Sequence, residues 1–281
     1  MLKPLVLAPQ IVLRGLAQIL LLRTATAGAL VLCGLLLASP ALAGAAVLGS
    51  ALGSLLALFP GQPRQDLGLG LHGYNTALAA MAAQAVFEPS LAALVLIVGM
   101  VALTAFILRA WRPWPVPLYT APFVLGVWAV TAAAPLLGLE PAAASASVPA
   151  VTLTDGLMHG LAQVLLVQSL PAGLCVLCAV ALESPRLAVR ALAASALGLA
   201  IGLLLDRPQG ALAAGLAGFN AVLCVLALPR GTVRQVLVAA SAATLLSLAA
   251  QGLGIPAFSA PFILSTWAVL MHARRTGMAR N

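Results

Sequence analysis

Charged residues are rare in this chain, and their rarity decides the class of protein before any motif is considered. Only 7% of the 281 residues are Asp, Glu, Lys or Arg, whereas 63% are hydrophobic and the mean hydropathy is +1.12. A soluble domain needs far more polar surface, so the composition excludes a soluble enzyme or binding module. It is typical of a polytopic helical membrane protein, whose surroundings are the lipid bilayer.

Acidic residues are the scarcer sign of charge, with six Asp and Glu against fourteen Lys and Arg. The basic residues lie singly or in pairs at the ends of apolar segments, not in the clusters that a nucleic-acid partner would require. No acidic residue lies at the centre of an apolar segment, where ion-coupled carriers generally hold an ionisable group. The sequence favours passive conduction of a neutral solute, although sodium held by backbone carbonyls stays open.

Cysteine and histidine are also scarce, and no catalytic motif is present. The four cysteines lie inside apolar runs, so we interpret Cys175 and Cys178 as buried packing thiols, although their spacing also fits a redox or metal dyad. His72 and His159 have no histidine at the matching position of the repeat described next. The chain contains no Gly-x-Ser-x-Gly, His-Glu-x-x-His or P-loop sequence. We therefore expect no enzyme activity, no catalytic residue, no metal site and no cofactor.

What the chain does contain is an internal repeat. Three matches define it: Gly-Leu-Ala-Gln at 15–18 and 160–163, Gly-Tyr/Phe-Asn at 73–75 and 218–220, and Ala-Pro-Phe at 121–123 and 260–262. The first two have an offset of 145 residues and the third an offset of 139. The Gly-aromatic-Asn match fits a helix-packing motif. A duplicated membrane protein usually places its substrate path where the two halves meet.

Each half consists of a short apolar stretch followed by five longer ones. The short stretches, 11–22 and 157–168, do not reach across a hydrocarbon core of about 30 Å and are predicted to be re-entrant helices. The longer ones predict ten spans at about 24–39, 41–59, 68–87, 91–109, 117–136, 171–183, 187–205, 211–229, 232–250 and 256–272. The predicted fold is an all-α polytopic membrane protein with a first repeat at 1–140, a linker at 141–156 and a second repeat at 157–281.

The distribution of basic residues predicts how the repeats lie in the membrane. Because five spans is an odd number, the second repeat must enter from the opposite side, which makes the repeats inverted. With a cytoplasmic N-terminus, and with Arg14 and Arg23 beside the first short helix left uncounted, eleven basic residues fall inside and only Arg207 falls outside. Both termini are therefore predicted to be cytoplasmic. We also expect the protein to lie in the inner (plasma) membrane of a bacterium.

A few polar side chains recur in both repeats, and these are the first candidates for a site. Gln18 and Gln163 lie on the short helices, where an amide must face protein or water; lining a pore and joining helices are the two interpretations. Thr120 and Ser259 precede the Ala-Pro-Phe matches, where proline frees a backbone carbonyl. A hydroxyl there would either bind a polar solute or repair the helix.

Taken together, these elements resemble the urea transporter family. The resemblance rests on the Gly-x-x-Gln opening, on Gly-Tyr/Phe-Asn-x-x-Leu and on Thr/Ser-Ala-Pro-Phe-x-x-x-x-Trp, which occur twice in the same order over nearly the whole chain. It implies a homotrimer in which every protomer has its own pore between inverted repeats. Urea would pass in single file, without energy coupling, through a flat slot with apolar walls and oxygen acceptors along its edges.

Carried over by position, the resemblance implies a substrate pathway of ten residues: Gln18, Leu21, Tyr74, Leu78, Thr120, Gln163, Leu166, Phe219, Leu223 and Ser259. Carbonyl and amide oxygens would replace the water lost by the four N–H groups of urea, and the apolar walls would exclude hydrated ions. Leu21 and Leu166 stand where family members often carry phenylalanine. A channel for another small neutral solute (ammonia, a short amide or water) therefore stays open, as does a membrane scaffold or enzyme subunit that transports nothing.

Overall fold

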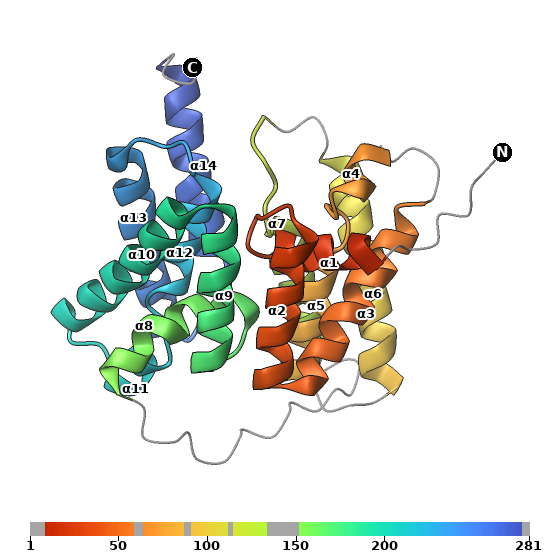
Figure 1. Cartoon of the computed structure of the whole chain (residues 1–281), viewed down its shortest axis with the longest axis horizontal. Coiled ribbons are helices and arrows are strands. Elements are labelled where there is room, and N and C mark those ends of the chain that lie inside the picture. Colours follow the sequence, from red (N-terminus) through yellow and green to blue (C-terminus); the bar gives the residue numbers. More distant parts are fainter. Residues whose placement is uncertain (1–8, 59–63, 87–90, 112–114, 134–151, 277–281) are drawn as a thin grey trace.

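A computed structural model of the chain describes residues 9–58, 64–86, 91–111, 115–133 and 152–276, in which all regular structure is helical (Figure 1). The first half contains α1 (Pro9–Gln18), α2 (Ala25–Ala38), α3 (Pro40–Leu56), α4 (Arg64–Gly68), α5 (Tyr74–Val86), α6 (Leu91–Ala110) and α7 (Ala121–Ala133). The second half contains α8 (Leu153–Ala162), the 3-10 helix η2 (Gln163–Leu165), α9 (Leu170–Glu183), α10 (Pro185–Leu204), α11 (Gln209–Ala213), α12 (Phe219–Ala227), α13 (Val233–Gly252) and α14 (Ala260–Arg275).

The second half repeats the first half helix for helix, with α8 to α14 following the order of α1 to α7. The start of the third helix shows why the same sequence gives the same structure. Ser39 Oγ accepts the amide of Leu42 at 3.3 Å, and Ser184 Oγ accepts the amide of Leu187 at 3.3 Å. The serine cap pairs one of the amides that a helix start leaves without a partner, and the proline that follows has no amide hydrogen to pair. This combination starts α3 and α10 sharply.

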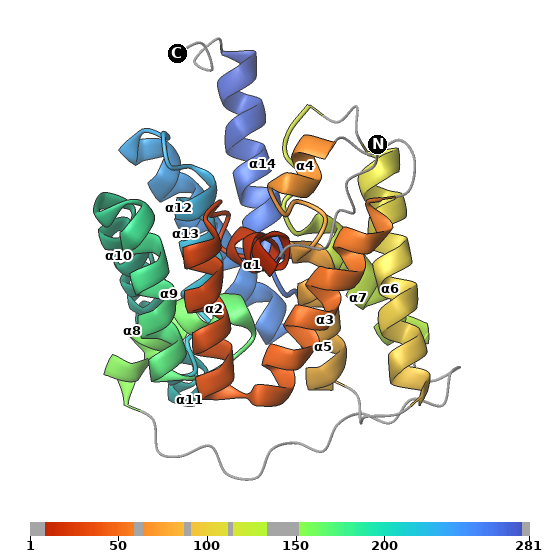
Figure 2. The ribbon, with the colours of Figure 1, turned by 45° about the vertical axis from the view of Figure 1, so that its right-hand side comes forward.

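The two halves contact each other reciprocally, which is what a two-fold relation between them produces. α2 packs on its equivalent α9, and α7 packs on its equivalent α14; Figures 1 and 2 show α2 beside α9 from two directions. Trp128 Nε1 donates to the carbonyl of Pro256 at 2.8 Å, and Trp267 Nε1 donates to the carbonyl of Pro117 at 2.8 Å. Both pairs obey the offset of 139, so each half holds the other by the same bond.

The short first helix of each half packs closely against the third helix. A Cβ at Gly15 would lie 2.2 Å from Ser50 Oγ, and a Cβ at Gly160 would lie 2.1 Å from Ser195 Oγ. The two serines donate to backbone carbonyls of the facing short helices, at 3.0 and 2.7 Å. Small residues allow this approach and hydroxyls stabilise it, which accounts for the glycine of the repeated Gly-Leu-Ala-Gln sequence.

The predicted spans at 68–87 and 211–229 are wrong as continuous helices. In the first half α4 ends at Gly68 and α5 begins at Tyr74, and in the second half α11 ends at Ala213 and α12 begins at Phe219. The hydropathy pattern does not reveal these breaks because apolar residues continue through both of them.

At both breaks the chain turns at a glycine, in a position where a larger residue does not fit. Gly70 has a φ of 75° and Gly215 a φ of 79°, in the left-handed region. A Cβ on Gly70 would lie 2.4 Å from the backbone nitrogen of Gly15, and a Cβ on Gly215 would lie 2.3 Å from that of Gly160. The loop therefore packs directly on the short helix in each half. This contact brings the loop carbonyls within reach of the glutamine that follows Gly15 or Gly160 by three residues.

Within the described residues, two helices are by themselves long and apolar enough to cross a membrane: α10 and α13. Residues 154–165 and 170–183 make a third if they count as one span, bent by 73°. The apolar helices α2, α3 and α7 are shorter, at 14, 17 and 13 residues. The count of ten spans stays a prediction that rests on the sequence pattern rather than on helix length.

The predicted linker ends earlier than expected. α8 begins at Leu153, so the last four residues of the linker 141–156 are helical. The amide of Thr152 donates to Asp155 Oδ2 at 2.8 Å, a capping contact that starts the helix there. Residues 141–151 lie outside the described residues, and the limits of the two repeats stay predictions.

The interpretation of Cys175 and Cys178 as buried is wrong for Cys178, which is exposed. Cys33 on α2 and Cys178 on α9, which match in the repeat, are exposed, whereas Cys224 is buried and Cys175 is half-buried. All four are free thiols. On an apolar helix, the residues that point away from the core are as apolar as those that point into it. The sequence alone therefore does not distinguish exposed from buried positions.

Candidate functional site

Both short helices end in the same tight turn. Leu21 has a φ of 58° and Leu166 a φ of 57°, and their amides donate to the carbonyls of Gln18 and Gln163 at 2.9 and 3.0 Å. A residue other than glycine in this region costs about 1–2 kcal/mol, so the surrounding packing must hold it. In the first half the turn also supplies donors to the carbonyls before Gln18, since the amides of Ile19 and Leu20 donate to the carbonyls of Leu16 and Ala17 at 3.2 and 2.9 Å.

The side chains of the two glutamines make equivalent contacts. Gln18 Nε2 donates to the carbonyl of Leu69 at 3.2 Å, and Gln163 Nε2 donates to the carbonyl of Ala214 at 2.9 Å. Each bond joins a short helix to the loop that seats on it. Because the amide nitrogen is used in this way, Oε1 remains the group with which the side chain can accept a further hydrogen bond.

Asn75 and Asn220 brace the turns that precede α7 and α14, a role that the helix-packing interpretation of their motif missed. Asn75 Nδ2 donates to the carbonyl of Tyr119 at 3.0 Å, and its Oδ1 accepts the amide of the third residue of α7 at 3.1 Å. Asn220 makes the same bonds to the carbonyl of Phe258 at 3.1 Å and to the third residue of α14 at 3.2 Å. Both asparagines are fully buried.

The braced turns bring together four aromatic residues, of which the sequence analysis did not single out Tyr119 and Phe258. Tyr119 and Phe258 are left-handed, with φ values of 48° and 47°, which is unusual for aromatic residues. Their rings cross to the other half: Tyr119 packs on Phe262 with ring centres 5.1 Å apart, and Phe258 packs on Phe123 at 5.7 Å. Neither left-handed position is a glycine or an asparagine, the residues that usually mark such a conformation in a sequence.

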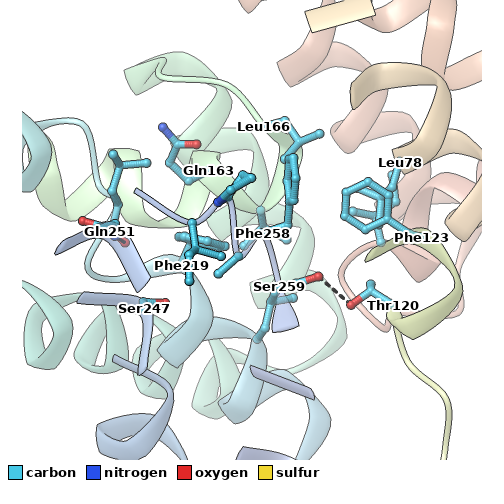
Figure 3. Close-up of a pocket in the computed structure, with 17 residues that line it drawn as sticks. Leu78, Thr120, Phe123, Gln163, Leu166, Phe219, Ser247, Gln251, Phe258 and Ser259 are labelled. Atoms are coloured by element: carbon cyan, nitrogen blue, oxygen red, sulfur yellow. Dashed lines mark hydrogen bonds between the residues drawn. The ribbon is translucent and has the colours of Figure 1, made fainter. Parts of the chain in front are cut away.

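The residues after these aromatics meet where the two halves join. Thr120 Oγ1 and Ser259 Oγ lie 2.7 Å apart, and both side chains are buried (Figure 3). They are equivalent in the repeat, so the contact joins the same position of the two halves. Each hydroxyl offers one donor and two acceptor positions, which leaves the pair able to bind a further polar group.

Two cavities are lined by equivalent residues of the two halves. The Phe219 cavity, of about 290 Å³, is lined among others by Gln163, Leu166, Leu216, Phe219, Pro256 and Phe258 (Figure 3). The Tyr74 cavity, of about 660 Å³, is lined among others by their six counterparts Gln18, Leu21, Leu71, Tyr74, Pro117 and Tyr119. The duplication of the sequence has thus produced a pair of cavities.

All ten of the residues that the family resemblance marks as a pathway line one of these cavities. Gln18, Leu21 and Tyr74 line the Tyr74 cavity, and the remaining seven line the Phe219 cavity. Leu78 and Thr120, which belong to the first half, reach into the Phe219 cavity together with their counterparts Leu223 and Ser259. The Phe219 cavity therefore extends across the junction between the halves.

Two further polar residues of the Phe219 cavity were missed by the motif comparison. Ser247 Oγ accepts Asn220 Nδ2 at 2.6 Å, and Gln251 Nε2 donates to the carbonyl of Leu216 at 3.1 Å. Both lie on α13, where the offset between repeats changes, so matching at a fixed offset does not reach them.

The two cavities differ in charge. Among the described residues, none that lines the Phe219 cavity is charged, whereas Arg23 and Asp66 line the Tyr74 cavity. An uncharged, mostly apolar cavity with a few hydrogen-bonding oxygens cannot replace the hydration of an ion, but it can replace that of a small neutral solute.

The comparison with known proteins agrees with this geometry. Residues 10–274 match the family profile described as Urea transporter. The chain is 28% identical over 245 residues to Urea transporter 1 of Rattus norvegicus and 29% identical over 245 residues to Urea transporter 1 of Ovis aries. Each match covers 77% of this chain and 62% of the relative, so the chain spans less than two thirds of the length of these curated relatives. The family match extends through both halves and includes every residue of the two cavities. The chain therefore belongs to the urea transporter family.

Proposed function

We propose that this membrane protein conducts urea passively, along a path that runs through the Tyr74 and Phe219 cavities and past the Thr120–Ser259 pair. The observation that carries this proposal is that all ten residues implied by the family resemblance line two cavities related by the repeat. The uncharged lining of the Phe219 cavity supports a neutral solute over an ion.

The chemistry of urea fits the residues at each stage of this path. Urea has four N–H donors along its edges, which Gln18 Oε1 and Gln163 Oε1 would accept at the two cavities, since the Nε2 of each amide is already bonded to backbone. The hydroxyl pair would exchange its mutual hydrogen bond for bonds to the solute between the cavities. Leu78, Leu223 and the ring of Phe219 would pack on the flat faces of the solute and exclude its hydration water.

We further propose the architecture that this path requires. The repeats are inverted about an axis in the membrane plane, ten segments span the bilayer, and three protomers, each with its own pore, associate in a bacterial inner membrane with both termini in the cytoplasm. The reciprocal Trp128–Pro256 and Trp267–Pro117 bonds support a two-fold relation between the halves. The odd number of predicted spans in each half and the excess of basic residues inside support its direction.

The test is urea uptake into proteoliposomes, followed by stopped-flow light scattering. The full chain is compared with the Gln18→Leu/Gln163→Leu double variant and with Gln168→Leu, a control with the same chemical change at an exposed position outside both cavities. We expect fast urea uptake by the unchanged protein and by the control, independent of pH and sodium gradients. We expect urea uptake by the double variant to be slower by a factor of about ten or more, because two hydrogen bonds to the solute are removed.

A second solute class is favoured by Leu21 and Leu166. Both line the cavities with aliphatic side chains rather than aromatic ones, which relaxes the demand for a strictly planar solute. The same vesicles exposed to acetamide, ammonia or water gradients distinguish the two. Absence of urea uptake with retained passage of one of these solutes would replace urea as the substrate and keep the path.

A further inference from the structure

The Phe219 cavity contains a second amide with the same arrangement as the repeated glutamine. Gln251 Nε2 donates to the carbonyl of Leu216 at 3.1 Å, and Gln163 Nε2 donates to the carbonyl of Ala214 at 2.9 Å. Both side chains are half-buried and line the cavity, where Figure 3 shows them on different elements, α13 and η2. One loop therefore fixes two glutamines by their nitrogen atoms.

This arrangement leaves two acceptor oxygens in one uncharged cavity. An amide whose nitrogen is bonded to a backbone carbonyl still has both acceptor positions of Oε1. The remainder of the lining is mostly apolar, including Leu166, Leu216 and Ile255, so a hydrogen bond made there is poorly contested by water. Two acceptors in such surroundings suit a solute with several N–H donors.

The other half of the molecule has no amide at the position equivalent to Gln251, and the second glutamine that lines the Tyr74 cavity, Gln65, is exposed. Leu108, near the end of α6, lines the Tyr74 cavity as Gln251, near the end of α13, lines the Phe219 cavity. The pair has an offset of 143, between the offsets of 145 and 139 found on either side. The same offset pairs Thr104 with Ser247, two buried hydroxyl residues on the same two helices, which supports the alignment.

We propose that Gln251 is a solute-binding residue, and that it makes the Phe219 cavity a tighter binding site for urea or a similar small amide than the Tyr74 cavity. The inference rests on the proposed function and deepens it. Although the two halves are similar, the two ends of the path would bind urea with different affinity. The path itself stays passive, since unequal affinity at the ends of a channel moves no solute against its gradient.

The repeat supplies a pair of mirror variants to test this inference. Gln251→Met removes the amide from the Phe219 cavity and nearly keeps its volume, and Leu108→Gln installs an amide in the Tyr74 cavity. Urea uptake is measured at increasing urea concentrations in right-side-out and inside-out vesicles from cells that express the full chain. Each preparation gives the half-saturating concentration at one face.

We expect the unchanged protein to show a lower half-saturating concentration at one face than at the other. Gln251→Met should raise the value at that face by about 2- to 10-fold, the range for one neutral hydrogen bond, and leave the opposite face unchanged. Leu108→Gln should lower the value at the opposite face by a similar factor. Gln168→Leu, the control introduced above, should change neither.

The outcomes separate this inference from the function on which it rests. No urea uptake by the unchanged protein would overturn the proposed function. Normal uptake with equal values at both faces, or with no effect of Gln251→Met at either face, would overturn the role of Gln251. If Gln251→Met slowed urea, acetamide and water equally at both faces, the residue would only hold the 214–216 loop, and the inference would be wrong.

Discussion

The two halves of this protein agree in the buried bonds that brace their turns and differ at some of the positions that line the cavities. Asn75 and Asn220 brace their turns by the same two bonds, at distances that agree within 0.1 Å. At the cavities, by contrast, Tyr74 is equivalent to Phe219 in the repeat and Leu108 is equivalent to Gln251. Backbone bracing leaves no freedom because an unmade buried hydrogen bond is expensive, whereas a cavity wall accepts any side chain of suitable size. The shared asparagines therefore keep the fold, the shared glutamines serve both ends of the path alike, and the unequal residues set how the two ends differ in what they bind.

The largest effect that we expect comes from the glycines that both halves share. Gly70→Ala and Gly215→Ala each place a Cβ within 2.4 Å of backbone and in the left-handed region, and should destabilise the protein by roughly 3–5 kcal/mol. Thermal unfolding in detergent measures this loss, and little folded protein should be recovered from either variant.

Gly254→Ala is the matched control for these two variants. Gly254 has a φ of 69°, but nothing lies within 4 Å of the position of its Cβ, so this change adds the backbone strain without the clash. It should cost only about 1 kcal/mol. If all three variants were equally stable, the close seating of the loops on α1 and α8 would not hold the fold.

The next effect distinguishes the two asparagines. Tyr74 Oη donates to the carbonyl of Tyr119 at 2.5 Å, so in Asn75→Ala this carbonyl keeps one donor, whereas Phe219 offers no hydroxyl in the second half. We expect Asn220→Ala to lower the free energy of unfolding by about 2–4 kcal/mol and Asn75→Ala by less. Tyr74→Phe/Asn75→Ala should remove the difference between the halves.

Two observations check this comparison. Thr76→Val, on the same helix as Asn75, removes a buried hydroxyl that bonds only to the carbonyls of the two residues just before that helix, and it should change stability little. A larger loss in Asn75→Ala than in Asn220→Ala would contradict the compensation by Tyr74.

The smallest effect concerns the hydroxyl pair at the junction. Thr120→Val and Ser259→Ala each leave the other hydroxyl without its partner at 2.7 Å, at an expected cost of about 1 kcal/mol. The double variant should be little worse than either single variant, because the two residues share one bond. Additive losses in thermal unfolding would show that each hydroxyl is held by other groups.

The sequence supported the site better than it supported the helices around it. Gln18, Thr120 and their counterparts are polar residues in an apolar chain, so the repeat alone made them visible. The breaks at Gly70 and Gly215 were missed because hydropathy measures burial and not backbone direction. Gln251 was missed because it has no identical partner, so a comparison of repeats passes over it.

The sequence by itself determined the class of protein, the duplication and the family. These depend on composition and on the order of motifs, which no folding step alters. Only the tertiary structure decided that Tyr119 and Phe258 adopt left-handed turns and that Trp128 and Trp267 cross to the other half. It also decided that the seven predicted pathway residues in the Phe219 cavity come from both repeats. Such contacts join residues more than a hundred positions apart, and their geometry arises from packing that no local pattern encodes.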